Sequence, residues 1–411
     1  MNQYPTPGWP PPGSQPQQAA PPPGAVPYSP PAPGGAPAPA YGQAPYGQPA
    51  YGPGPYGMPP QPGWQAAPPG AAPAYLPPTG PAYPGMAAPA FALNAPQGNP
   101  RAKAAAKTMN RMCLCVIAQT AASFLWSFLF SALVAFSGAD LLTDHMAYLW
   151  LSAALVPLST ALPFALYLAL GKKDPAQYLR FGKVGFLTGF LCVLGGLAIC
   201  MLGNYPAFFL QDLLGFFGYQ PTSSVALGGE NTWASLALEF CSTAVLVPVM
   251  EEFAFRGVLF SALRKHGTGF AVVGSALVFS LVHLDASSVL FAFIAGLVFG
   301  FLYARTNNLW VTIAIHGLNN GIAVLTGYLD LLVPESAAEL ANALFLLVPI
   351  GVGLAALVLL GVFRRKLFPR GNWQETPYPL EAGEAAQGVV RAPLFWVTVA
   401  MMLAYTFTLF L

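Results

Sequence analysis

Charged side chains are scarce in this sequence: 17 of the 411 residues are Lys or Arg and 15 are Asp or Glu, 8% in all. About a quarter of the residues of an ordinary soluble domain are charged, whereas 55% here are hydrophobic, which excludes a single soluble globule. The formal net charge of +2 cannot neutralise a phosphate backbone, so a nucleic-acid partner is also excluded. The five cysteines lie in apolar stretches without the spacing of a disulfide scaffold.

Residues 1–100 lack charge altogether, and the first charged residue is Arg101. The same stretch holds 32 of the 44 prolines, together with many glycines. Proline and glycine interrupt helices and ladders, and there are too few aliphatic residues to bury a core. We therefore expect residues 1–100 to be a disordered, Pro/Gly/Ala/Tyr-rich tail. No apolar run follows the first Met, so no cleavable signal peptide is expected.

Long apolar runs begin after Arg101, and a run of about 20 such residues is enough for a helix to cross a bilayer. We predict an all-α, polytopic transmembrane bundle of eight to nine spans, with an extra interfacial helix over residues 205–218. The predicted membrane-embedded core covers residues 101–365, and residues 366–411 form a cytoplasmic linker and a C-terminal transmembrane helix. The expected spans are residues 113–137, 147–170, 184–202, 233–255, 268–284, 288–304, 309–328, 341–363 and 393–411.

The distribution of charge supports these spans. If the tail is cytoplasmic and every segment crosses once, all 17 basic residues fall on the cytoplasmic side. The charged residues of the loops on the other side are then all Asp or Glu. Positive charge is retained on the cytoplasmic side during insertion, so this segregation predicts a multi-pass protein of the cell membrane with a cytoplasmic N-terminal tail.

Two adjacent carboxylates follow the apolar run of the fourth span. On a regular helix Glu252 and Arg256 share a face and can form an ion pair, whereas Glu251 points about 100° away. A carboxylate without a cationic neighbour in an apolar site suits a general base or acid. The structural alternative is a pair at the helix end, with Arg256 extended to the headgroups.

Two of the four histidines also lie in apolar spans. His283 follows Phe279 by four residues, and His316 precedes Asn320 by four residues, which places each pair on one helical face. An imidazole and an amide arranged in this way could orient a water or accept a carbonyl oxygen, although a single intramembrane histidine can equally be a packing residue. The loop residue His266 is expected to be solvated surface.

These residues form three motifs, each on its own apolar segment: E-E-x-x-x-R, F-x-x-x-H and H-x-x-x-N. The ordered set resembles the CPBP family of intramembrane proteases, which comprises type II CAAX prenyl endopeptidases and bacteriocin-processing or immunity (Abi) proteins. The resemblance covers roughly residues 180–365. The motif residues are Glu251, Glu252, Arg256, Phe279, His283, His316 and Asn320.

The resemblance implies hydrolysis of peptide bonds in membrane-anchored peptides or proteins within the lipid bilayer. It implies that Glu251 activates the attacking water with help from His283. His316 and Asn320 would bind the scissile carbonyl and stabilise its oxyanion, while Glu252 and Arg256 would hold the geometry of the site.

The same resemblance implies a metal, because members of the family are commonly described as metal-dependent. Glu251, His283 and His316 could supply ligands to zinc. The sequence lacks the H-E-x-x-H motif that marks a zinc helix, however, and water activation by glutamate alone is equally compatible with these residues.

Two other functional classes also fit this pattern. A non-catalytic immunity or scaffold protein could bind a partner through the same cavity and through the tail. A proton-coupled transporter also uses intramembrane Glu and His, but the sequence lacks the internal repeat that pairs the halves of many transporters.

Overall fold

A computed structural model describes most of the chain after the Pro/Gly-rich region. The predicted disordered tail lies outside the described residues except for its last two positions. The described residues are 99–137, 145–220, 231–368, 376 and 378–410.

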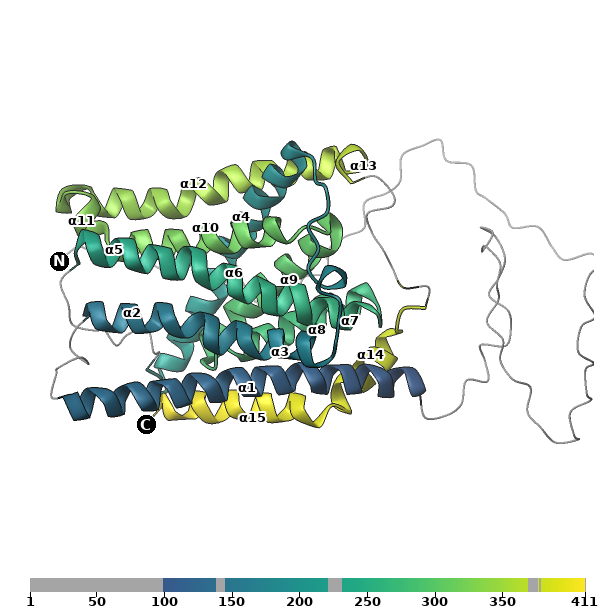
Figure 1. Ribbon diagram of the computed structural model, residues 1–411. Helices are drawn as coiled ribbons and strands as arrows, with labels where there is room; N and C mark the ends of the chain where they lie inside the picture. Colours follow the sequence, from purple (N-terminus) through teal and green to yellow (C-terminus); the bar gives the residue numbers. More distant parts are fainter. Residues whose placement is uncertain (1–98, 138–144, 221–230, 369–375, 377, 411) are drawn as a thin grey trace, which may run out of the picture. The chain divides into compact units, whose positions relative to one another are not determined.

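The described part of the chain is helical, as predicted, and contains no β-strand (Figure 1). Seven of its helical segments are long and apolar enough to cross a bilayer, or eight if one bent pair of helices forms a single span. The polytopic all-α bundle is therefore confirmed. Its first half consists of α1 (Pro100–Ser137), α2 (His145–Val156), η2 (Pro157–Ala161), α3 (Leu162–Leu170), η3 (Pro175–Gln177) and α4 (Phe186–Gly215).

The second half contains the segment in which the three motifs lie. The fourth predicted span is one long apolar segment, Trp233–Arg264, in which α-helical and π-helical turns alternate. Its parts are α5 (Trp233–Glu239), η5 (Phe240–Leu246), α6 (Val247–Glu252), η6 (Phe253–Phe260) and α7 (Ser261–Arg264). The remaining helices are α8 (Thr268–Leu281), α9 (Ala286–Thr306), α10 (Leu309–Gly327), α11 (Leu329–Leu332), α12 (Glu335–Val362), α13 (Arg364–Leu367), α14 (Ala382–Val390) and α15 (Pro393–Thr408).

The expectation of a separate interfacial helix over residues 205–218 is wrong. Helix α4 continues through Pro206 to Gly215 without a break. A proline inside a helix leaves a carbonyl of the preceding turn without its partner. In that turn the side-chain amide of Asn204 donates to the carbonyls of Cys200 and Met201, at 3.5 and 3.3 Å. These contacts reinforce the turn that precedes Pro206.

Helix α8 is shorter than a full span. Its 14 residues extend about 21 Å, less than the roughly 30 Å of hydrocarbon. It turns directly into α9 through a loop in which Leu284 has φ 61° and Asp285 caps the next helix by accepting from the Ser287 and Ser288 amides. This tight connection leaves His283 at the turn between two packed helices.

The C-terminal segment is bent. Helices α14 and α15 meet at 68°, and α15 lies beside α1, so the first and last described helices are neighbours (Figure 1). The Leu394 amide donates to Asn110 Oδ1 at 3.0 Å, and a Cβ added at Gly388 would lie 3.1 Å from Ala105 Cβ. The predicted C-terminal transmembrane helix is thus half of a broken apolar pair.

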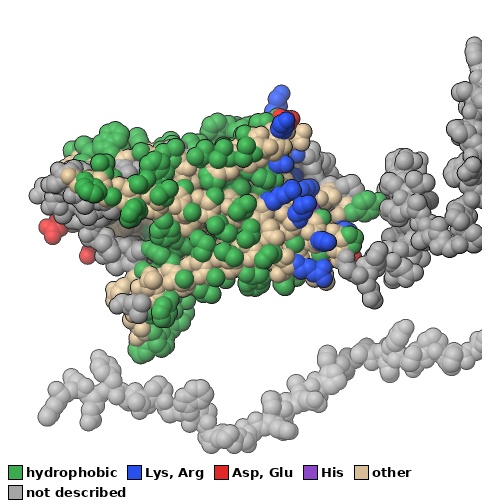
Figure 2. All heavy atoms as spheres, turned by 60° about the horizontal axis from the view of Figure 1, so that its bottom comes forward, with side chains coloured by type: hydrophobic (Ala, Val, Ile, Leu, Met, Phe, Trp, Pro, Cys, Tyr) green, Lys and Arg blue, Asp and Glu red, His purple; other side chains and the backbone are tan. Residues whose placement is uncertain are grey.

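Lys and Arg side chains gather at one end of the helices, where α1 begins and where α9 and α12 finish (Figure 2). We call this the basic end and define it by Arg101, Lys173, Lys265, Arg305 and Arg365. The beginning of α12, at the other end, carries acidic side chains instead. The segregation of charge expected from the sequence is therefore present in the folded chain.

Candidate active site

The two adjacent glutamates lie where the fourth span changes its helical pitch. Glu251 and Glu252 end α6, and η6 begins directly after them. π-Helical turns contain more residues than α-helical turns and occur frequently at functional sites. With π-helical segments on both sides of α6, the directions of its side chains depart from the regular 3.6-residue repeat.

Glu252 and Arg256 form the predicted ion pair, and they form it in the interior of the protein. Arg256 Nη1 lies 2.9 Å from Glu252 Oε1, and both side chains have 0% exposure. The guanidinium carbon also lies 4.2 Å from the ring centre of Phe279 and 4.8 Å from that of Phe299. Arg256 therefore does not extend to the headgroups, and the alternative of a helix-end surface pair is excluded.

This buried pair is incompletely satisfied. Within the described structure, Glu252 Oε2 and the Nε and Nη2 atoms of Arg256 have no hydrogen-bond partner. Buried polar atoms without partners cost free energy, so a buried ion pair of this kind is a poor source of stability. The pair fixes the position of the Glu252 carboxylate instead, and that carboxylate contacts the next motif residue.

His316 on α10 lies between the two glutamates. Its Nδ1 is 3.1 Å from Glu252 Oε1, and its Nε2 is 3.8 Å from Glu251 Oε2. A carboxylate oxygen only accepts hydrogen bonds, so Nδ1 carries the proton of this contact and Nε2 faces Glu251. On a regular helix Glu251 would point about 100° away from Glu252. One imidazole still lies near both carboxylates, because its two nitrogens point in different directions.

A glycine allows α10 to approach the fourth span this closely. A Cβ added at Gly317 would lie only 2.7 Å from the carbonyl oxygen of Ala244 on η5. Any side chain at this position would push the two segments apart. The residue after His316 therefore sets the distance between the imidazole and the glutamates.

His283 reaches the same region from the turn after α8. Its Nδ1 donates to the Phe279 carbonyl at 3.1 Å, which fixes the ring and directs the other nitrogen away from the helix. The spacing of four residues in the F-x-x-x-H motif corresponds to this contact. Phe279 also touches the guanidinium of Arg256, so one aromatic ring connects the first two motifs.

The three motifs line one cavity of about 240 Å³. Glu251, His283, His316 and Asn320 all contribute to its wall, so the convergence on which a shared site depends is present. The Glu251 side chain is 16% exposed and the His316 side chain 9%. The cavity thus presents one accessible carboxylate, with a second carboxylate fully buried behind it.

The amide of Asn320 is fixed by the backbone of the fourth span. Its Nδ2 donates to the carbonyl of Thr243 at 3.0 Å. The neighbouring Asn319 and the α9 residue Ser288 also line the cavity, and the sequence analysis missed both. Asn319 could have been found from the sequence, because two adjacent asparagines are unusual in an apolar helix. Nothing in the sequence distinguishes Ser288 from other serines.

His283 also borders a second, polar cavity of about 230 Å³. Gln119, Thr120 and Ser123 on α1 and Tyr405 on α15 line this space. The oxygen of the Gln119 side-chain amide is buried and has no partner among the described residues. Polar buried sites with unsatisfied groups are where internal water is found. One histidine thus separates the cavity with the glutamates from a second space suited to water.

The described residues do not gather into a recognisable metal site. They contain no group of three or more His, Cys, Asp and Glu side chains that could hold a metal ion. Of the three expected zinc ligands, His283 has its Nδ1 on a backbone carbonyl and keeps only Nε2 for another contact. Zinc binding by Glu251, His283 and His316 stays a prediction, and no step below passes through a metal.

Comparison with known proteins agrees with the motifs. Residues 233–322 match the family described as type II CAAX prenyl endopeptidase Rce1-like, and this segment includes every candidate site residue from Glu251 to Asn320. The putative membrane peptidase YdiL of Bacillus subtilis is 33% identical over 158 residues, 37% of this chain and 62% of that protein. The membrane-embedded CAAX protease MroQ of Staphylococcus aureus is 32% identical over 109 residues, 25% of this chain and 44% of that protein.

These matches are partial. The chain aligns with less than two thirds of the length of either relative. No solved structure matches the chain.

Proposed function

We propose that the chain is a membrane-embedded endopeptidase with Glu251 as its general base, because residues 233–322 match the family described as type II CAAX prenyl endopeptidase Rce1-like. The observation that carries the proposal is the single cavity lined by Glu251, His283, His316 and Asn320. The substrates we infer are membrane-anchored peptides or proteins, of the CAAX type or related to bacteriocins. The basic end would face the cytoplasm, as would the N-terminal tail.

In the proposed reaction, Glu251 takes a proton from a water molecule in the cavity. The water oxygen forms a bond to the scissile carbonyl carbon, and the carbonyl electrons move to the oxygen. The oxyanion then re-forms the carbonyl as the C–N bond breaks, and Glu251 returns the proton to the leaving amide nitrogen, so no oxidant or reductant is needed. General-base catalysis of this kind contributes about 10²–10⁴-fold to a rate.

The other residues of the cavity would act on the developing charge. Nδ1 of His316 would stay on Glu252, and Nε2 would bind the carbonyl oxygen of the substrate. Asn320 would offer its amide from the same side of α10. Donors aimed at an oxyanion in a dry site are usually the largest single contribution to acyl transfer. His283 would orient the attacking water.

The direct test is cleavage of membrane-anchored and prenylated peptides by the purified protein and its Glu251→Gln variant. We expect kcat to fall by about 10²–10⁴-fold, because the amide keeps the shape of the side chain but cannot accept the proton. Glu339→Gln is the matched control, since Glu339 is an exposed acid on α12. Equal turnover by all three proteins would exclude the proposed role of Glu251.

The same measurement separates the other functional classes. A scaffold or immunity protein would retain partner binding in Glu251→Gln and would show no cleavage in either form. A proton-coupled transporter would show Glu251-dependent uptake in proteoliposomes without proteolysis.

Zinc remains an expectation drawn from the family resemblance alone. The zinc content can be measured by elemental analysis of the purified protein and of its Glu251→Gln and His316→Gln variants. Zinc present in the wild type and absent from both variants would require a metal step in the mechanism. Equal metal content in all three proteins would indicate that these side chains do not hold it.

A further inference from the structure

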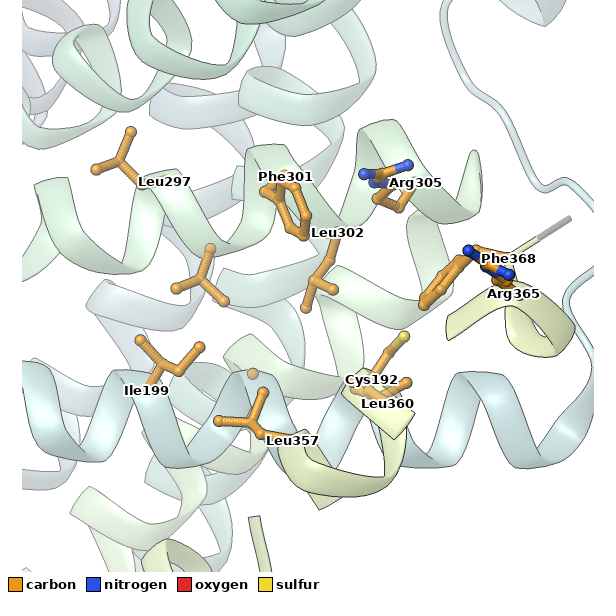
Figure 3. Close-up of a pocket in the computed structure, with 13 residues that line it drawn as sticks. Cys192, Ile199, Leu297, Phe301, Leu302, Arg305, Leu357, Leu360, Arg365 and Phe368 are labelled. Carbon is orange, nitrogen blue, oxygen red and sulfur yellow. The ribbon is translucent and has the colours of Figure 1, made fainter. Parts of the chain in front are cut away.

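A large apolar groove lies on the other side of α9 from the candidate active site. Its volume is about 730 Å³, which is within the range of small-molecule sites. Helix α4 packs against both α9 and α12, and the lining comes from these three helices and the segment that follows α12. The lining near the middle of the helices is aliphatic, as at Ile199 and Leu297 (Figure 3).

Small residues on α4 keep the floor of the groove low. A Cβ added at Gly196 would lie 2.6 Å from Ile315 Cδ1 and 3.0 Å from Leu302 Cδ1, so a larger residue there would have to displace these side chains. The nearby lining residue Cys192 is also short. Gly196 and Cys192 thus leave room at the α4 side of the groove.

Two arginines lie at one end of the groove. Arg305 is in the last turn of α9, and Arg365 is in α13, so both belong to the basic end. Figure 3 shows the two side chains together at one end, with Ile199 and Leu297 toward the other. The Arg305 guanidinium carbon lies 5.4 Å from the ring centre of Phe301, which also lines the groove. No Asp or Glu is among the described lining residues.

We propose that this groove binds one anionic glycerophospholipid, with its phosphate at Arg305 and Arg365 and an acyl chain along α4. Guanidinium groups form strong charge-assisted hydrogen bonds to phosphate. Basic pockets between transmembrane helices on the cytoplasmic side are known to bind anionic headgroups. An acyl chain would also fill a space that loses dispersion contacts when it is empty.

The groove is distinct from the candidate active site. The residues of α9 that line the cavity with Glu251 include Ala295 and Phe299, whereas those that line the groove include Val298 and Leu302. Neither the glutamates nor His283 and His316 line the groove. The lipid site therefore does not depend on the proposed peptidase reaction.

The test is native mass spectrometry of the full chain in detergent, titrated with phosphatidylglycerol or with phosphatidylcholine of the same acyl chains. We expect the wild type to bind one phosphatidylglycerol about tenfold or more tightly than phosphatidylcholine, because both lipids carry the phosphate but only phosphatidylcholine adds a cationic choline, which the two arginines repel. The double variant Arg305→Gln/Arg365→Gln should lose this preference. The matched control Lys103→Gln/Lys107→Gln removes two exposed charges of α1 outside the groove and should keep it.

A second variant tests the acyl-chain part of the groove. Ile199→Trp should weaken the binding of both lipids by about tenfold, because the indole would occupy the space along α4. Four results would overturn the proposal. The first three are equal affinity for the two lipids in the wild type, unchanged preference in the double arginine variant, and competition by free glycerol phosphate as strong as that by the lipid. The fourth is displacement of the lipid by a peptide that the protein cleaves, because the groove would then belong to the substrate.

Discussion

The two faces of α9 border cavities of opposite character. One face, with Ala295 and Phe299, contributes to a small cavity that contains carboxylate, imidazole and amide groups. The other face, with Val298 and Leu302, contributes to an apolar groove three times as large. Most of the α9 residues at both cavities are apolar, so the helix itself explains little of the difference.

The helices that face α9 account for the difference between the two cavities. On the first face, α6 and α10 bring Glu251 and His316 within 3.8 Å of each other. On the second face, α4 contributes a glycine and short side chains, and charge appears only at the end of the groove. Helix α9 therefore provides shape to both cavities, while the chemistry of each is determined by the helices opposite it. The predictions below test this division.

The largest effect on stability is expected at the buried ion pair behind the small cavity. Arg256→Met leaves the Glu252 carboxylate fully buried without its cation, and breaking such a pair costs about 3–5 kcal/mol. The free energy of unfolding in mild detergent, followed by far-UV circular dichroism during denaturation, measures the loss. The double variant Glu252→Gln/Arg256→Met should recover much of it, because no buried charge remains.

The groove supplies the matched control for this prediction. Arg305→Gln removes a half-exposed arginine of the basic end, and its cost should stay below about 1 kcal/mol. An equal loss of stability in Arg256→Met and Arg305→Gln would contradict the distinction between the two cavities.

The next effect compares neighbouring residues on the two faces of α9. Ala295→Leu adds bulk to the cavity with Glu251 and His316, so we expect kcat/KM on a cleaved peptide to fall by about tenfold or more through displaced reacting groups. Val298→Leu adds bulk on the groove face and should leave kcat/KM within about twofold. Peptide cleavage assays of both variants in the same detergent provide the measurement. Equal losses would mean that α9 transmits packing changes between its faces.

Much of the fold follows from the sequence because most of the apolar runs have the length that a bilayer requires. The small cavity could also be predicted, since carboxylate and imidazole groups are rare in these runs. The contact of His316 with both glutamates could not, because it depends on π-helical turns and on the approach that Gly317 permits. These features arise from packing between segments and leave no periodic signal.

The groove could not be predicted from the sequence, because the residues that line it are of common types rather than rare ones. Aliphatic residues such as Ile199 and Leu297 occur throughout the spans, so nothing distinguishes those that line a cavity. In the sequence, Arg305 and Arg365 could be recognised only as residues of two basic loops. They are 60 residues apart in the chain, so their position at the same end of one groove could not be predicted.

The expectation that His266, at the basic end, is a solvated surface residue is wrong. His266 is half-buried, and its Nε2 lies 2.9 Å from the Thr108 hydroxyl oxygen. That hydroxyl donates to the Ala104 carbonyl, so its oxygen accepts from the neutral imidazole. Short loops at the basic end press His266 against α1, which the sequence of the loop alone does not indicate.

The smallest effect is expected from this histidine, and it tests whether the pKa of a histidine outside either cavity is also lowered by its surroundings. Burial, reinforced by the charge of Lys265, lowers the pKa of His266 from 6.5 to about 4. The unfolded chain then binds more protons than the folded chain between these two values, so the free energy of unfolding falls as the pH drops from 6.5 to 4. Allowing for the part of the ring that solvent reaches, the loss should be about 1 kcal/mol. His266→Gln keeps a donor for Thr108 without titrating, so its free energy of unfolding should change less over this range when both proteins are denatured at pH 5 and pH 8. An identical pH dependence in the two proteins would assign the acid sensitivity to other groups.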